Sequence, residues 1–135
     1  TTDYLAAEAP HMTTVYSPEL NALFLADFGY NKVHLWLGDD ITRDRIATWR
    51  AELLRIQSKY AALNPKVYPG HGEPTDMTMF DTMVRYIDDF LRITAAAKSR
   101  DEAMQAMTAL YPGYKEADFF LKYSVDNHVK QDGVK

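Results

Sequence analysis

Hydrophobic positions near the start of the chain fall into short runs separated by turn-forming residues. Residues 13–16 are β-branched or aromatic, and residues 22–26 form a second apolar run. The Ser-Pro-Glu-Leu-Asn sequence between them (17–21) favours a turn. This pattern predicts a β-hairpin whose second strand ends at Asp27.

After the predicted hairpin the spacing of apolar residues changes. We expect a loop over residues 28–31 and a short strand or an extended segment over residues 33–37. From residue 42 to about residue 63, apolar side chains recur at intervals of three and four, which predicts a helix with one buried face. That face consists of Ile46, Trp49, Leu53, Ile56, Tyr60 and Leu63. Asn64-Pro65 should end the helix, because proline disfavours helical geometry in the residue before it.

The rest of the chain is mainly helical in pattern. A short strand is expected over residues 66–68, and a second helix after it has an apolar face of Phe80, Met83, Val84, Ile87, Phe90, Leu91 and Thr94. Ser99 and Glu102 have the spacing of a capping box. They would open a third helix that carries Met104, Met107 and Leu110 and is broken at residues 111–113.

A last amphipathic stretch contains Phe119, Phe120 and Tyr123, and the polar tail from Asn127 is expected to fray. The order of strands and helices predicts an α/β or α+β fold with helices laid on a sheet. We expect a single domain. Residues 1–76 would form its strand-rich portion, which carries the candidate site, and residues 77–135 its helical portion.

The amino-acid composition bears on the class of function more than on the fold. The 135 residues are 47% hydrophobic and 25% charged, as in globular domains, and no apolar run approaches the length of a membrane span. The start of the chain has no signal-peptide pattern, so we expect a cytoplasmic protein with no membrane partner. A net charge of −4 gives no reason to expect nucleic-acid binding. Because there is no cysteine, any metal must be held by histidine and carboxylate.

Three positions are candidates for chemistry. His71 lies in a Pro-Gly-His-Gly turn directly after a predicted strand, where α/β sheets gather functional groups. The alternative is an ordinary turn whose histidine faces solvent. Asp27 ends an apolar strand, where a metal or a cation would stabilise its carboxylate, although it could equally be an exposed aspartate that opens a turn. His11 precedes the first strand of the predicted hairpin, and by itself it is an ordinary loop histidine.

Together these positions resemble the metallo-β-lactamase superfamily in order and spacing, from Ala9 to about Pro74. In that superfamily a histidine precedes a strand (His11 here), an aspartate ends the next strand (Leu25-Ala26-Asp27), and a Pro-Gly-His-Gly turn (69–72) follows a further helix and strand. Residues 27–34, which include Tyr30-Asn31 and Val33-His34, also look like a hydrolase subgroup of this superfamily.

The resemblance implies half of an αβ/βα sandwich and a role for each candidate residue. His11 would complete a first zinc site, Asp27 would bridge two metals, and His71 would belong to the second site, with iron or manganese as alternatives to zinc. Asp27 and His71 would be the catalytic residues. A metal-bound hydroxide would then attack an ester, thioester, lactone, amide or phosphoester bond of a small-molecule substrate.

One family element is missing from this sequence. The H-x-H-x-D-H string that supplies most of the remaining ligands does not occur. Because three ligands cannot hold a dinuclear centre, we expect the chain to be inactive alone and to be the C-terminal part of an active hydrolase. A half sandwich also leaves apolar surface uncovered, so the alternative is a non-catalytic module that forms a homodimer or a larger oligomer. A third possibility is a small α/β domain in which the Pro-Gly-His-Gly turn is incidental.

Several other residues favour structural roles. His34 lies among apolar residues and is expected to be packed, while His128 in the polar tail is expected to be solvated. The methionines recur at helical spacing, which predicts that they pack in the core. Four aromatic residues could line a substrate pocket, although we expect each to belong to the core: Tyr30, Trp36, Phe119 and Phe120.

Overall fold

A computed structural model describes residues 2–5, 12–38 and 41–129. In chain order its elements are β1 (Thr2–Leu5), β2 (Met12–Ser17), β3 (Ala22–Tyr30), α1 (Arg43–Tyr60), the 3₁₀ turn η1 (Ala61–Leu63), β4 (Lys66–His71), α2 (Thr78–Ala96), α3 (Arg100–Leu110), the π-helical turn η2 (Ala117–Leu121) and α4 (Lys122–His128). The predicted mixed fold, with helices laid on a sheet, is confirmed as an α+β arrangement. None of the helices in these ranges combines the length and the apolar character needed to cross a bilayer.

The strands form one mixed sheet in the order β1-β2-β3-β4. β2 and β3 make the predicted antiparallel hairpin, in which Val15 pairs with Phe24. β4 lies parallel to β3, so α1 serves as the crossover between them. Leu23 pairs with Val67 near the start of these two strands.

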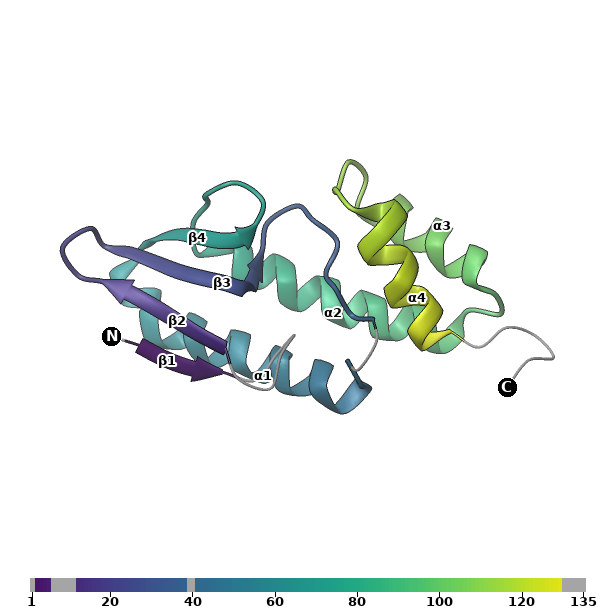
Figure 1. Cartoon of the computed structure of the whole chain (residues 1–135), viewed down its shortest axis with the longest axis horizontal. Coiled ribbons are helices and arrows are strands. Elements are labelled where there is room, and N and C mark those ends of the chain that lie inside the picture. The colour runs from purple at the N-terminus through teal and green to yellow at the C-terminus, as the bar shows by residue number, and fades with distance from the viewer. Residues whose placement is uncertain (1, 6–11, 39–40, 130–135) are drawn as a thin grey trace.

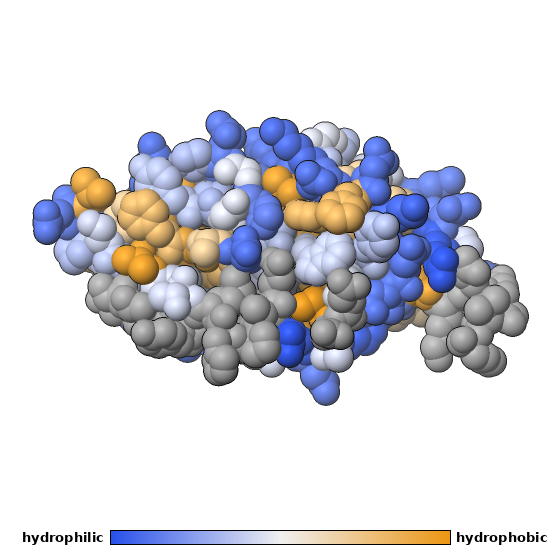
Figure 2. All heavy atoms as spheres, in the orientation of Figure 1, coloured by the Kyte–Doolittle hydropathy of each residue, from blue (hydrophilic) through white to orange (hydrophobic). Residues whose placement is uncertain are grey.

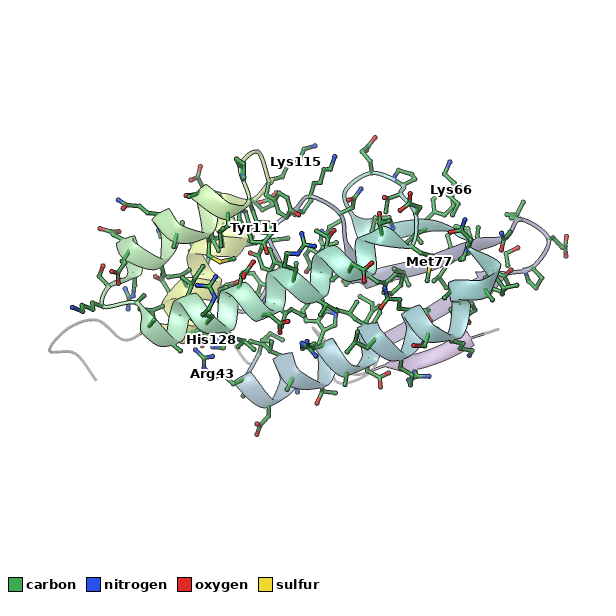
Figure 3. All side chains as sticks on the ribbon, turned by 180° about the vertical axis from the view of Figure 1, so that it is seen from behind. Arg43, Lys66, Met77, Tyr111, Lys115 and His128 are labelled. Atoms are coloured by element: carbon green, nitrogen blue, oxygen red, sulfur yellow. The ribbon has the colours of Figure 1, made fainter. Side chains whose placement is uncertain are left out.

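Helices α1 and α2 cover one face of the sheet, as the view from behind in Figure 3 shows. Tyr16 of β2 packs on Tyr60 of α1 with ring centroids 5.1 Å apart, and the Trp49 indole donates a hydrogen bond to the Phe28 carbonyl oxygen at 3.2 Å. On the α2 side, the backbone amide of Tyr30 donates to the Met83 sulfur at 3.4 Å. The core of the molecule therefore lies between this face and the two helices, and it continues to α3 and α4, where Met107 and Val125 are buried.

The opposite face of the sheet is turned to the viewer in Figure 1, and no helix of the described ranges lies on it. Val15 and Phe24 are 43% and 39% exposed there, and Tyr68 stacks on Phe24 with ring centroids 4.9 Å apart. We call these three residues the open sheet face. Figure 2 shows apolar side chains at this surface over the strands, and again near the start of α4.

Local chemistry accounts for the helix boundaries, although Leu63, predicted on the buried face of the first helix, lies beyond the end of α1 and is 50% exposed. The Thr42 hydroxyl accepts a hydrogen bond from the amide of Arg45 and caps α1, and Asn64 ends η1 in a left-handed conformation at φ +46°. At the start of α3, the Ser99 hydroxyl accepts from the Glu102 amide at 3.1 Å, as the capping box predicts.

The structure corrects the prediction that β3 ends at Asp27 and is followed by a loop over residues 28–31. The strand continues to Tyr30, because β4 resumes its pairing there (Tyr30 with His71) and because Phe28 and Tyr30 are buried core residues. Strand β1, which pairs with β2, was not predicted.

Residues 33–37 form an extended segment fixed by α4, with one isolated bridge between Val33 and Lys115. The Ser124 hydroxyl accepts from the Leu37 amide at 2.7 Å and donates to the Leu35 carbonyl at 3.1 Å. The prediction that the chain frays from Asn127 is wrong up to residue 129, because the Asn127 side chain donates to the Leu37 carbonyl and α4 extends through the next residue.

Candidate functional site

The candidate site begins with an irregularity in β3. Ala26 has a positive φ of 49°, and the pairing register between β3 and β4 shifts on both sides of it. A bulge of this kind bends the strand and re-aims the side chain that follows, which is why bulges are frequent beside active sites. The side chain of Asp27 is accordingly 60% exposed at the point where the ladder is interrupted.

The Pro-Gly-His-Gly turn at the end of β4 approaches this bulge closely. A Cβ added to Gly70 would lie 2.4 Å from the Ala26 carbonyl oxygen, so only glycine lets the two backbones come this near. Gly72 has φ +98°, and a Cβ there would lie 2.1 Å from the Asn31 carbonyl oxygen. Both glycines that flank His71 are therefore required by the geometry of the turn.

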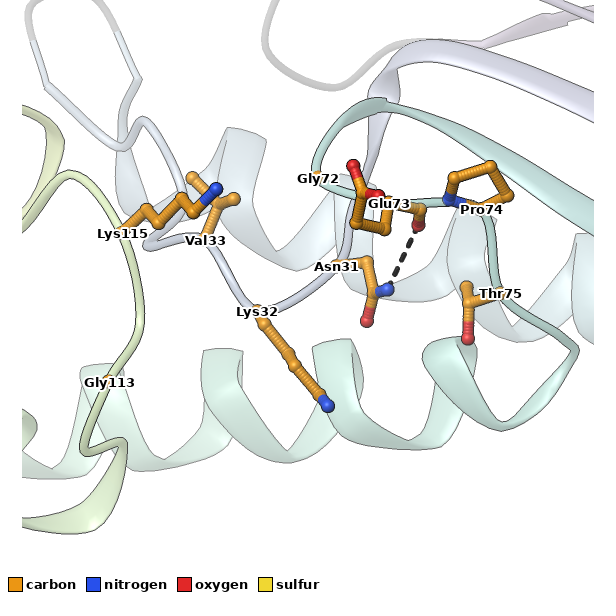
Figure 4. Close-up of a pocket in the computed structure, with 9 residues that line it drawn as sticks. All are labelled: Asn31, Lys32, Val33, Gly72, Glu73, Pro74, Thr75, Gly113 and Lys115. Atoms are coloured by element: carbon orange, nitrogen blue, oxygen red, sulfur yellow. Dashed lines mark hydrogen bonds between the residues drawn. The ribbon is translucent and has the colours of Figure 1, made fainter.

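Asn31 fastens the same turn from the end of β3. Its backbone amide donates to the His71 carbonyl at 2.9 Å, and its side-chain amide donates to the Glu73 carbonyl at 3.0 Å (Figure 4). The backbone of His71 is thus held on both sides.

These features bring two of the three predicted site residues together. His71 Nε2 lies 3.1 Å from Asp27 Oδ1, although the two residues come from different strands. The imidazole stacks on Tyr30 at a centroid distance of 4.4 Å and meets the edge of Phe120 at 5.3 Å. The ring is therefore oriented by aromatic packing, and 27% of the His71 side chain remains exposed.

The separation of the two side chains suits a shared metal ion. Zinc binds imidazole nitrogen and carboxylate oxygen at about 2.0–2.2 Å. Asp27 and His71 would therefore serve as two ligands of such an ion. The pair alone is an incomplete ligand set, since no three His, Cys, Asp or Glu residues in the described part of the chain are grouped to hold a metal. His11, the third predicted ligand, lies outside the described residues.

The two remaining histidines are both packed. His34 is buried, as predicted, and its Nδ1 forms a 2.8 Å hydrogen bond with the Tyr86 hydroxyl. Burial lowers the pKa of His34 to about 4, so its ring is neutral at physiological pH. The prediction that His128 is solvated is wrong, because its Nε2 lies 2.8 Å from the Leu37 carbonyl oxygen and its ring meets Phe90. Burial lowers the pKa of His128 as well.

The aromatic residues divide between core and surface. Tyr30 is buried, as expected for a core residue. The prediction that Phe119 belongs to the core is wrong, because its side chain is 49% exposed. Trp36 and Phe120 are half-buried. The sequence did contain a signal for Phe119: it lies four residues before Tyr123, while Leu121 and Val125 occupy the buried side of the same helical segment.

A cleft of about 390 Å³ lies beside the turn, lined by Asn31, Lys32, Val33, Gly72, Glu73, Pro74, Thr75, Gly113 and Lys115 (Figure 4). Neither Asp27 nor His71 lines it. Its walls come from three segments distant in sequence, so no local pattern could have predicted it.

No protein-family model matches the sequence, and a search of curated proteins finds no significant match.

Proposed function

We propose that this chain is the C-terminal part of a metal-dependent hydrolase that resembles the metallo-β-lactamase superfamily, with Asp27 and His71 as metal ligands and His11 as a third. The observation that carries the proposal is the 3.1 Å approach of Asp27 Oδ1 to His71 Nε2 at a strand bulge. Zinc fits this donor set best, and iron or manganese is compatible with it.

The chain's own residues prepare this site for an ion. The bulge at Ala26 aims Asp27, and the stacked ring of Tyr30 and the edge of Phe120 fix the plane of the His71 imidazole. Such orientation of a ligand by its neighbours strengthens metal affinity. When bound, the metal would supply a hydroxide able to attack an ester, thioester, lactone, amide or phosphoester bond.

The proposal requires further ligands from outside this sequence. Asp27 and His71 hold one edge of a site, and the missing H-x-H-x-D-H segment would supply the rest. The open sheet face fits this requirement, because a second layer of an αβ/βα sandwich would cover Val15, Phe24 and Tyr68. The chain alone should therefore bind metal weakly and have no hydrolase activity.

The direct test is to read the sequence encoded upstream of Thr1 and to measure the metal content of the protein that carries both parts. We expect an H-x-H-x-D-H string upstream. Bound zinc should fall in His71→Ala and stay unchanged in His128→Ala, whose histidine is packed elsewhere. Unchanged zinc stoichiometry in His71→Ala would contradict the proposed role of the turn.

The open sheet face also supports a second candidate function. The chain could be a non-catalytic module in which a second copy covers this face, because exposed apolar surface on a sheet tends to pair. Sedimentation at increasing protein concentration would then show a dimer or a larger oligomer. A monomer at high concentration would contradict this candidate and leave the hydrolase proposal in place.

A further inference from the structure

Four aromatic side chains form a continuous group beside the candidate site. Trp36 lies 5.8 Å from Phe119, 5.7 Å from Phe120 and 6.1 Å from Tyr123, measured between ring centroids. Phe119 also meets Tyr123 edge-on at 5.3 Å. We call Trp36, Phe119, Phe120 and Tyr123 the aromatic cluster.

The cluster leaves aromatic surface in contact with water. Phe119 is 49% and Tyr123 45% exposed, and both Trp36 and Phe120 keep part of their surface accessible. Single exposed apolar residues need no explanation, but adjoining aromatic rings with half of their surface in water are typical of a binding site. In Figure 2, apolar side chains accordingly reach the surface near the start of α4.

The backbone beneath the cluster accounts for its outward position. Glu116 has φ +68°, and the π-helical turn η2 that follows runs into α4. Leu121, Ser124 and Val125 face the core from this segment, which leaves Phe119 and Tyr123 on the other side. Short π-helical turns are rare and often mark functional sites.

Phe120 connects the cluster to the candidate site. It contacts Trp36 on one side and the His71 imidazole on the other, at 5.7 Å and 5.3 Å. A molecule that packs against the cluster would therefore have its next group beside His71 and Asp27.

We propose that the aromatic cluster binds the aryl group of the substrate and thereby places its scissile ester, thioester or amide beside Asp27 and His71. The inference rests on the proposed function for the reacting group. Aromatic rings prefer offset-stacked or edge-to-face contacts, and Trp36, Phe119 and Tyr123 already meet one another in tilted and edge-to-face arrangements that an added aryl ring could extend. A substrate whose acyl or leaving group is aromatic is thus favoured over one with only small polar groups.

The experiment titrates the ¹⁵N-labelled chain with 2-naphthoate in the presence of a chelator, so that binding does not depend on metal. Acetate, which has the same carboxylate without the rings, is the control ligand. We expect 2-naphthoate, and not acetate, to shift the Trp36 indole signal, the amides of residues 117–123 and the imidazole signals of His71.

Phe119→Ala and Leu110→Ala form a matched pair of variants, because both wild-type side chains are 49% exposed and only Phe119 belongs to the cluster. Phe119→Ala should raise the dissociation constant for 2-naphthoate roughly fivefold, the effect of losing one aromatic contact. Leu110→Ala should leave it unchanged. Unaltered amide spectra away from the substitution would show that each variant is folded.

Failure of this inference is distinct from failure of the proposed function. Three outcomes would overturn the proposal that the aromatic cluster binds an aryl group: no binding of 2-naphthoate, equal effects in the two variants, or binding that leaves the His71 signals unshifted. Each would do so whatever the metal content of the protein that carries both parts. Unchanged zinc stoichiometry in His71→Ala would overturn the hydrolase assignment even if 2-naphthoate binds the cluster.

Discussion

His34 illustrates at the scale of one residue how burial decides the chemistry of a side chain. It follows Val33 in the extended segment of residues 33–37, and its ring is enclosed and hydrogen-bonded to the Tyr86 hydroxyl. Desolvation holds its pKa near 4, so the folded protein keeps the ring neutral where the unfolded chain would protonate it. His34 is therefore a structural residue with a measurable effect on stability.

That effect predicts a pH dependence. Between pH 6.5 and about 4 the unfolded chain binds a proton at His34 that the folded protein does not, so stability falls as the pH is lowered through this window. The full loss is about 3 kcal/mol, from 1.36 kcal/mol per pKa unit. Urea denaturation of wild type and His34→Asn at pH 7 and pH 4.5 would measure it. The variant should lose less stability on acidification, and equal losses would show that His34 is not responsible.

The two residues of the site that could be predicted from sequence each had a local signal. His71 is flanked by glycines and Asp27 ends an apolar run, and the structure confirms that they meet. What the sequence could not give is the cause of the meeting, since the positive φ of Ala26 is unusual for alanine and follows from the tertiary approach of β4.

At the scale of elements, the parallel contact between β3 and β4 determines the site. At Gly70 the two strands come so close that the Ala26 carbonyl lies in the space that a Cβ would need. The same contact explains why β3 continues beyond Asp27. Pairing with a partner distant in the sequence extended the strand through Phe28 and Tyr30, and hydrophobic periodicity alone does not contain that information.

Gly70→Ala is accordingly predicted to destabilise the fold by about 2–3 kcal/mol, because a methyl group would force the two backbones apart. Gly113→Ala is the control. Among the described residues nothing lies within 4 Å of its added Cβ, so only the strain of φ +80° remains, which is about 1 kcal/mol. Urea unfolding followed by circular dichroism would compare the two. A smaller effect at Gly70 than at Gly113 would mean that the strands approach less closely than described.

For the whole molecule, the open sheet face is the principal feature. Helices α1 and α2 cover one side of the sheet (Figures 1 and 3), while on the other side Val15 and Phe24 are exposed and Tyr68 is half-buried. The sequence shows an apolar run over residues 22–26 of β3, but it does not show which side the helices would cover, because both sides of the strand carry apolar residues. Both candidate functions require a second layer here.

If the second layer is another copy of the chain, Phe24→Lys should raise the dimer dissociation constant about tenfold or more, since an unpaired charge would be buried in the interface. Leu20→Lys is the matched substitution, because Leu20 is 71% exposed in the turn between β2 and β3, outside the open sheet face. Sedimentation equilibrium would measure both. Equal association in the two variants would place the interface elsewhere.

The crossover through α1 also sets an order of events during folding. We expect the hairpin of β2 and β3 to close early and β4 to join later, because the pairing of β4 with β3 closes a much longer loop, which contains α1. In this order Asp27 would be in place before His71, and the pair would exist only once β4 has joined the sheet. An ion bound to both Asp27 and His71 would link β4 to β3 and would slow the detachment of β4 from the sheet.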